Sequence, residues 1–128
     1  MHHDDLIDLV ADLQHDLGKY LRQPLAFLPA EATDGEVREA LETAIKRTRR
    51  TPRGVRGAHM IWQEIVDEGG ETLRAFSAFA PLEAAVRQAL GWEASLADSA
   101  PIDRQRALDD MSAVADAIRD LADEVHAR

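Results

Sequence analysis

The chain has 128 residues, of which 45% are hydrophobic and 30% are charged, and its formal net charge is −9. This length is sufficient for one domain with a buried core, and the composition, poor in Gly and Pro, favours helices and argues against disorder. There is no cysteine, which excludes disulfides, thiol catalysis and thiolate metal sites. We therefore expect a single α-helical domain over residues 1–128.

The acidic balance and the first residues restrict the expected partners and location. A chain with a charge of −9 is repelled by nucleic acid and by anionic membranes unless a local basic patch dominates. No apolar run approaches the ~18 residues of a membrane span. The start of the chain lacks the basic and apolar regions of a secretory signal. We therefore expect a cytoplasmic protein with no membrane partner, and the charge disfavours nucleic acid.

The first predicted helix covers residues 4–22. Its apolar residues recur at spacings of four and three and form one stripe, made by Leu6, Val10, Leu13, Leu17 and Tyr20. At ~100° per residue, His15 falls opposite the centre of this stripe, so we expect its side chain to face solvent. Pro24 and Pro29 bracket an apolar loop that we expect to lie against the core.

The second predicted helix begins near Thr33 and ends before Thr51-Pro52. Thr33 and Glu36 have the spacing of a capping box, in which the two residues satisfy each other's backbone N–H groups. A basic connector at residues 53–57 follows, and we expect it to be flexible because it contains two glycines.

The second half of the chain predicts three more helical segments. A short helix at residues 58–68 is expected to stop at Gly69-Gly70. The segment 71–90 contains Pro81, which predicts either a kink or two short helices with Pro81 near the start of the second. The last helix is expected from about residue 101 to 126, with Pro101 in its first turn. No strand pattern is present, so the fold class is all-α, a bundle of four long helices plus a short one.

The most distinctive motif is His15-Asp16-Leu17-Gly18-Lys19. Together with Tyr20 and Leu21 it resembles the H-box of histidine kinases and phosphotransferases, in which an exposed histidine on a bundle helix accepts a phosphoryl group. The resemblance implies that His15 is the phosphoacceptor, with Asp16 and Lys19 beside it, and a neighbouring acid can hold the imidazole tautomer that leaves one nitrogen free. Tyr20 stands where kinases usually have proline. The chain has no Gly-rich ATP-binding segment, so it could only receive or pass on phosphate.

The doublet His15-Asp16 also resembles the central motif of HD-domain phosphohydrolases, in which it binds a divalent metal with a histidine from a preceding helix and a distant aspartate. This resemblance implies Asp67 as the downstream ligand and His59 as an additional one. The preceding helix is missing here, because the upstream histidines lie on the same short N-terminal segment. We therefore expect no cofactor, and a divalent metal at His15, Asp16 and Asp67 is the alternative.

Two pairs of acids lie three residues apart, Glu36 with Glu39 and Glu64 with Asp67. They resemble the magnesium-binding pattern of all-α NTP pyrophosphohydrolases, in which such pairs share one helix face and supply oxygen ligands. This spacing arises often by chance in acid-rich helices. We therefore interpret these acids as a solvated helix face.

A basic segment at residues 46–56 supplies the candidate anion-binding residues. It contains six of the 15 basic residues of the chain and no acid. The candidates, besides Lys46, are Arg47, Arg49, Arg50, Arg53 and Arg56. They could bind phosphate groups, an acidic partner or nucleic acid, although the aromatic residues that stack on bases are absent. The simpler interpretation is that they offset a strongly acidic chain and favour the end of the second helix.

These observations predict a regulatory or protein-interaction module rather than an enzyme. The expected partner is another protein, and a homodimer through an exposed apolar edge is an alternative. Phosphotransfer through His15 ranks second among the predicted functions, and a metal-dependent phosphohydrolase ranks third. The simplest interpretation of His15 itself is an ordinary surface residue on a polar helix face.

Overall fold

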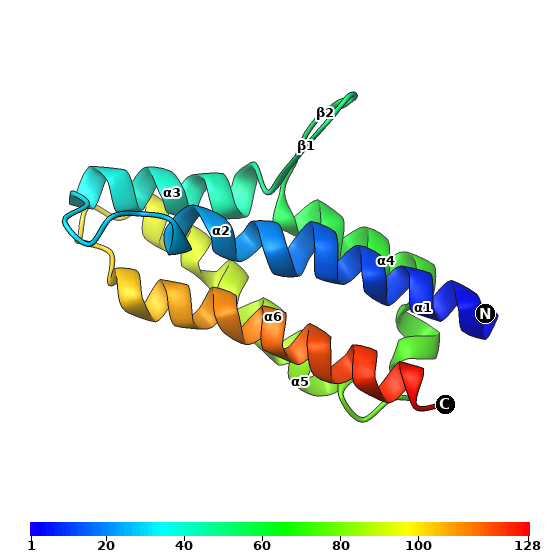
Figure 1. The fold of residues 1–128 in the computed structure, drawn as a ribbon. Helices are drawn as coiled ribbons and strands as arrows, with labels where there is room; N and C mark the ends of the chain where they lie inside the picture. The colour runs from blue at the N-terminus through cyan, green and yellow to red at the C-terminus, as the bar shows by residue number, and fades with distance from the viewer.

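The computed structural model describes all 128 residues and is 73% helical, which confirms the all-α bundle. The helical elements are α1 (His3–Asp12), the π-helical segment η1 (Leu13–Lys19), α2 (Tyr20–Ala26), α3 (Asp34–Lys46), α4 (Ala58–Leu73), α5 (Phe79–Leu90), the 3-10 segment η2 (Gly91–Leu96) and α6 (Arg104–His126). Two short strands, β1 (Arg49–Thr51) and β2 (Gly54–Arg56), form a hairpin at the side of the bundle (Figure 1). None of the helices combines the length and apolar character that crossing a membrane requires.

The elements α1, η1 and α2 run on as one helix, which is longer than the predicted 4–22 because it continues through Pro24. Its core side carries four leucines spaced by four residues and fully buried: Leu13, Leu17, Leu21 and Leu25. In a regular α-helix, residues four apart drift by about 40° around the axis. The wider turns of the π-helical segment offset that drift, so the leucines stay in line with the core.

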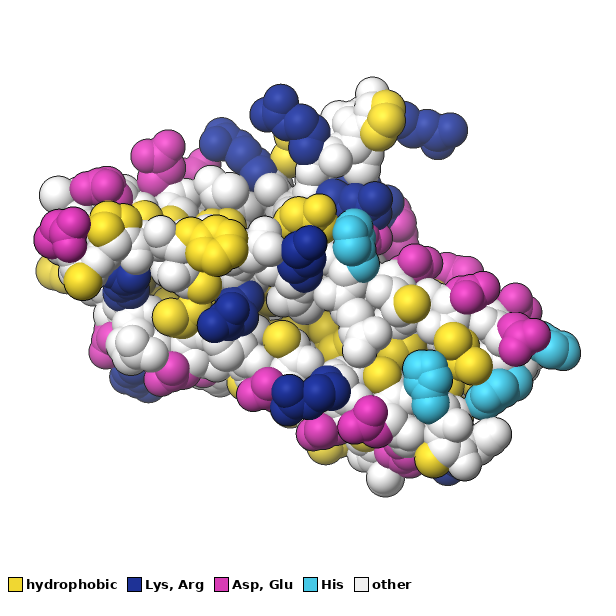
Figure 2. Space-filling model, in the orientation of Figure 1, with side chains coloured by type: hydrophobic (Ala, Val, Ile, Leu, Met, Phe, Trp, Pro, Cys, Tyr) yellow, Lys and Arg dark blue, Asp and Glu magenta, His cyan; other side chains and the backbone are white.

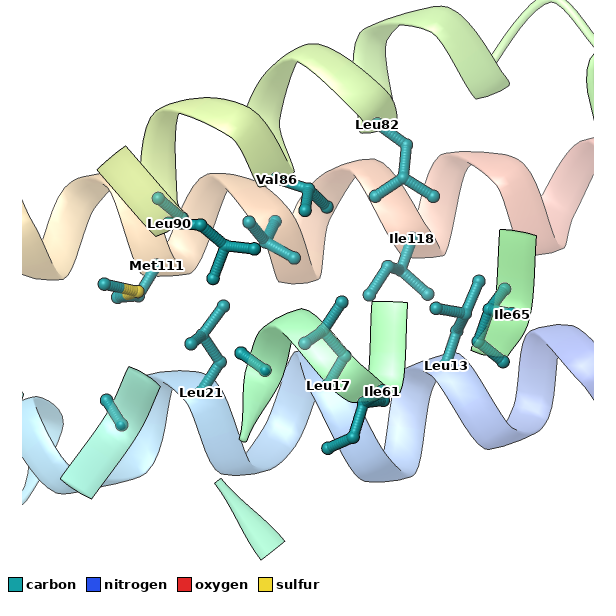
Figure 3. Packing of buried hydrophobic residues seen from close by; sticks show 14 of the residues in the cluster. Leu13, Leu17, Leu21, Ile61, Ile65, Leu82, Val86, Leu90, Met111 and Ile118 are labelled. Atoms are coloured by element: carbon teal, nitrogen blue, oxygen red, sulfur yellow. The ribbon is translucent and has the colours of Figure 1, made fainter. Parts of the chain in front are cut away.

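One core of 30 buried hydrophobic residues holds the helices together. Figure 3 shows how its side chains converge: those of the first helix face α4, α5 and α6. The labelled residues are Leu13, Leu17, Leu21, Ile61, Ile65, Leu82, Val86, Leu90, Met111 and Ile118. Each such side chain contributes roughly 1.5–3 kcal/mol when it is fully buried, so this cluster dominates the stability of the fold.

The first helix and α6 approach each other closely at Gly18, which is buried. A Cβ atom at this position would lie 3.3 Å from Cδ1 of Ile118 and 3.7 Å from Cα of Ala115. The missing side chain therefore lets η1 and α6 pack backbone to backbone. The prediction of an apolar loop from Pro24 to Pro29 is wrong in its first part, because Leu25 and Ala26 belong to α2. The expected packing against the core holds for Leu25, which is buried, but not for Phe27, which is 76% exposed.

The helix boundaries around the basic segment depart from the predicted ones in two places. The capping box at the start of α3 is confirmed: Thr33 N donates to Glu36 Oε1 at 3.2 Å, and Glu36 N donates to Thr33 Oγ1 at 3.2 Å. However, α3 ends at Lys46, earlier than predicted. The predicted stop at residues 69–70 is wrong, since α4 continues to Leu73. A side chain at Gly69 would collide with Leu9 of α1, so this glycine makes room for a neighbouring helix and does not end its own.

Within the segment 71–90, residues 71–73 end α4, a turn follows, and α5 begins at Phe79. Pro81 lies in the first turn of α5, as the second alternative predicted, but the segment does not form two short helices of its own. A carboxylate from α6 supports this turn: Ser77 N and Ala78 N donate to Glu124 at 2.7 and 2.8 Å. These bonds, that from Ala78 above all, lower the pKa of Glu124 below its ordinary value. The last helix begins at Arg104 with Asp103 as its N-cap, so the prediction that Pro101 lies in its first turn is wrong.

The expectation that the chain has no strands is also wrong, because residues 49–56 of the basic segment form an antiparallel hairpin. Arg49 pairs with Arg56, Arg50 with Val55, and Thr51 with Gly54. Gly54 has a φ of +130°, a conformation that side chains other than glycine rarely adopt, and the hydroxyl of Thr51 donates to its carbonyl at 3.0 Å. Strands of three residues are too short to show an alternating pattern, which is why the sequence gives no signal for them.

Candidate functional site

His15 lies on the solvent side of η1, with 52% of its side chain exposed. This confirms the prediction from its position opposite the apolar stripe of the helix. Its Nδ1 atom lies 2.9 Å from Oδ1 of Asp16. An ionised carboxylate can only accept a hydrogen bond, so in this contact Nδ1 carries the proton and donates. The Nε2 atom then keeps its lone pair and makes no hydrogen bond within the protein.

Asp16 joins His15 to the hairpin. Its Oδ1 atom also accepts a hydrogen bond from Nη1 of Arg49 at 2.5 Å, and only 16% of the Asp16 side chain is exposed. Arg49 is the first residue of β1, so this ion pair fixes one base of the hairpin to the first helix.

An aromatic side chain adds a third neighbour to His15. The rings of His15 and Tyr20 meet edge to face with their centroids 5.3 Å apart, and Nζ of Lys19 lies 5.6 Å from the centroid of Tyr20. Lys19 is exposed and has no acidic partner. The predicted set of His15, Asp16 and Lys19 is therefore gathered on one side of the helix, with Tyr20 between the histidine and the lysine.

The predicted anion-binding arginines divide into anchored and unpaired side chains. Arg49 is held by Asp16, Arg56 pairs with Glu64 of α4, and Arg47 lies 3.8 Å from Glu42. By contrast, Arg50 and Arg53 are exposed and have no acidic partner. In Figure 2 dark-blue side chains extend from the hairpin, away from the magenta acids of the bundle. The hairpin is therefore fixed at its base and carries unpaired positive charge at its outer part.

A groove of about 510 Å³ lies between the hairpin and α4, and we call it the hairpin groove. Its lining is formed by Thr51, Pro52, Arg53, Gly54, Val55, Arg56, Met60 and Glu64. Val55 and Met60 are 46% and 53% exposed, which makes them two of the four large hydrophobic side chains that the chain exposes. The lining thus combines two exposed apolar side chains with Arg53 and with Arg56, which is paired with Glu64. Exposed apolar side chains, Met and Arg are features of protein-binding surfaces.

The residues predicted as metal ligands do not come together in the structure. No group of three or more His, Cys, Asp and Glu side chains is placed to hold a metal ion. Glu36 caps α3, Glu64 pairs with Arg56, and Asp67 accepts a hydrogen bond from Gln63 at 2.8 Å. His59 contacts Glu93 of η2 at 2.8 Å and so links α4 to that segment. Glu36, Glu64 and Asp67 therefore serve as a helix cap, an ion-pair partner and a hydrogen-bond acceptor, respectively.

No protein-family model, curated protein or solved structure matches this chain. The geometry of the site therefore carries the functional argument alone. Sequence reasoning named His15, Asp16 and the arginines as candidates but did not name Val55 and Met60, which line the hairpin groove. Nothing in their sequence context distinguishes them from core residues, because their exposure results from how the hairpin stands on α4.

Proposed function

We propose that the protein is a regulatory interaction module that binds an acidic, partly apolar segment of a partner protein in the hairpin groove. The observation that carries this proposal is that the unpaired Arg53 lines the groove together with the exposed Val55 and Met60. The second unpaired arginine, Arg50, is the cross-strand partner of Val55 in the hairpin. Unpaired cations attract an acidic segment over a distance, and exposed apolar side chains supply contact energy once it is bound.

The rest of the molecule favours a protein over a nucleic acid or a membrane as the partner. The net charge of −9 repels polyanions, whereas a short acidic peptide needs to approach only the hairpin. The groove has no aromatic side chain on which a base could stack. The ion pairs of Arg49 with Asp16 and of Arg56 with Glu64 fix both strands beforehand, which lowers the entropic cost of binding.

The test is a fluorescence anisotropy titration with a labelled peptide rich in Glu and Leu. The double variant Arg50→Gln/Arg53→Gln is expected to weaken binding by about tenfold or more, since it removes the unpaired charge of Arg53 in the groove and that of Arg50 opposite Val55. The variant Arg87→Gln/Arg106→Gln removes the same charge from exposed sites elsewhere and is expected to change the affinity less than twofold.

Two outcomes would contradict the proposal. Equal weakening in both double variants would mean that the peptide responds only to net charge. Tighter binding of a DNA duplex or of phosphatidylserine vesicles through Arg50 and Arg53 would assign the hairpin to a different class of partner. Sedimentation velocity of the free protein provides the remaining control, because self-association through the hairpin would also be sensitive to these arginines.

We further propose phosphotransfer through His15 as a second candidate function, favoured by the contact of Nδ1 with Asp16, which leaves Nε2 free. In this step the Nε2 lone pair attacks the phosphorus of an acyl phosphate. A P–N bond forms, the bond between phosphorus and the acyl oxygen breaks, and the carboxylate leaves. The Nδ1 proton remains on the ring, where Asp16 stabilises the resulting positive charge.

Acetyl phosphate is a suitable donor for testing this second function. Mass spectrometry is expected to find a phosphoryl group on wild-type protein and none on His15→Ala, with less labelling of Asp16→Asn. Phosphorus NMR then assigns the phosphate to nitrogen. Wild type that accepts no phosphoryl group, or equal labelling of His15→Ala, would rule out this role without affecting the proposal for the hairpin groove.

A further inference from the structure

A second groove lies between the first helix and α6, on the face of the bundle shown in Figure 2, and it contains neither His15 nor any residue of the hairpin. We call it the η1–α6 groove. Its volume is about 370 Å³, which falls within the range of small-molecule sites. It is lined by Gln14, Gly18, Lys19, Arg22, Gln23, Phe27, Ala115, Asp116 and Arg119. In Figure 2 dark-blue side chains gather over η1, α2 and α6 on this face.

The charge in this groove is opposite to that of the whole chain. Three cations, Lys19, Arg22 and Arg119, face one acid, Asp116, which pairs with Arg119 at 3.3 Å. Lys19 and Arg22 have no acidic partner. The Nε atom of Arg22 donates to Oγ of Ser112 at 3.0 Å, which orients the guanidinium and leaves its two terminal nitrogens without a hydrogen bond in the protein. An oriented, unpaired guanidinium is suited to two-point contact with an oxyanion.

Phe27 gives the groove an apolar rim. Its ring is 76% exposed, the largest exposure among the large hydrophobic side chains of the protein. An exposed phenyl ring at the edge of a polar groove has no role in the core and offers a flat surface on which another ring can stack. Gly18 contributes to the floor without a side chain, and the amides of Gln14 and Gln23 supply further polar contacts.

We propose that the η1–α6 groove binds a small aromatic phosphate, with the phosphate between Lys19 and Arg22 and the aromatic ring against Phe27. The proposal does not depend on the hairpin or on phosphorylation of His15. A phosphate monoester suits the site better than a carboxylate, because its two charges match the two unpaired cations.

Phenyl phosphate and inorganic phosphate are the two probes for isothermal titration calorimetry and for amide chemical shifts. Phenyl phosphate is expected to bind about fivefold more tightly than inorganic phosphate because of the ring contact. Arg22→Gln and Lys19→Gln are each expected to weaken both probes by about tenfold. Arg106→Gln, which removes an exposed cation on the same helix as Arg119 but outside the groove, is expected to change neither affinity by more than about twofold.

The variant Phe27→Ala separates the two halves of the proposed site. It removes an exposed side chain, so folding is preserved, and it is expected to reduce the affinity for phenyl phosphate to that for inorganic phosphate while leaving the latter unchanged. The absence of saturable phosphate binding would overturn the whole proposal. Equal weakening by Arg106→Gln would show that only the net charge matters, and an unchanged phenyl phosphate affinity in Phe27→Ala would overturn the aromatic half.

Discussion

The helical bundle and the hairpin are stabilised in different ways. The bundle encloses 30 buried hydrophobic residues, and its largest fully buried side chains come from every long helix. The hairpin, residues 49–56, has no fully buried side chain and is fixed by two ion pairs at its base, Arg49 with Asp16 and Arg56 with Glu64. A two-stranded hairpin is marginal on its own in water, so these anchors and the ends of α3 and α4 position it.

Because of this difference, the residues that stabilise the fold are not the residues that we propose for recognition. Because the hairpin contributes little to the core, its exposed residues can change without unfolding the bundle, and unpaired arginines are tolerated there. The core positions have no such freedom, since a change of volume at a close-packed site is felt throughout its neighbours. The predictions below test whether this separation holds, and they start with the largest expected effect.

Truncating a core side chain should lower the free energy of unfolding far more than truncating a hairpin side chain. Leu17→Ala is expected to lower the free energy of unfolding by about 2–5 kcal/mol, since a fully buried leucine is lost and a cavity remains. Val55→Ala in the hairpin is expected to change it by less than about 0.5 kcal/mol. Urea unfolding followed by circular dichroism measures both, and similar losses would remove the distinction between the two regions.

The close approach of the first helix to α6 should depend on the size of residue 18. Gly18→Val is expected to destabilise the protein by about 1–3 kcal/mol, because its branched side chain would overlap Ile118 and the backbone of α6. Gly18→Ala is the matched control: the one tight contact of its Cβ is with the end of the flexible Ile118 side chain at 3.3 Å, its backbone neighbours lie at an ordinary 3.7 Å, and alanine is the better helix former. A lower melting temperature for Gly18→Ala than for Gly18→Val would contradict this close packing of η1 against α6.

Loss of the capping box should have a moderate effect confined to the start of α3. Thr33→Ala is expected to cost about 1 kcal/mol, because the Glu36 N–H loses its acceptor. Thr33→Ser keeps the hydroxyl and should retain most of the stability. The comparison of these two variants by chemical denaturation isolates the hydrogen bond, and an equal loss in both would assign the effect to the methyl group.

A smaller, pH-dependent contribution is expected from Glu124. Its pKa is lowered in the folded protein, mainly by the hydrogen bond from Ala78, so the unfolded state takes up its proton first as the pH falls below 4.5. The stabilisation is therefore complete well above that pH and is lost as the pH falls through the lowered pKa. Glu124→Gln should reduce the decrease in melting temperature between pH 6 and pH 3. An unchanged pH profile would contradict the role of this carboxylate.

The smallest effect on stability is expected for the residues proposed to bind the partner. Arg50→Gln/Arg53→Gln should change the free energy of unfolding by less than about 0.5 kcal/mol, because both side chains are exposed and unpaired. Urea unfolding of this variant beside wild type is the measurement. A loss comparable to that of Thr33→Ala would mean that the hairpin arginines support the fold and are not free to serve recognition.

The sequence predicts those features that depend on residues close together in the chain. Apolar periodicity located every long helix, and the Thr33–Glu36 pair predicted the capping box at the start of α3. The position of His15 opposite the apolar stripe predicted that it faces solvent. The line of fully buried leucines at positions 13, 17, 21 and 25 also contained a signal for the π-helical segment, since a regular α-helix would turn this spacing away from the core.

Features that depend on contacts between distant residues were not predictable in this way. Gly69 resembles a helix stop, yet it lies inside α4, where the side chain of Leu9 from α1 occupies the space that a Cβ would take. Asp16 and Arg49 are 33 positions apart, and only the fold shows that this ion pair connects the histidine to the hairpin. The strands themselves were missed because three residues carry no periodicity.

Native-state hydrogen exchange, with and without the Glu- and Leu-rich peptide, tests the central claim most directly. In the free protein, amides of the hairpin should exchange through local opening while those of the bundle core require global unfolding. The peptide should then slow exchange in residues 49–56 and at the start of α4, and leave the bundle unchanged. Hairpin amides as protected as the core in the free protein, or protection by the peptide at another face, would contradict the account.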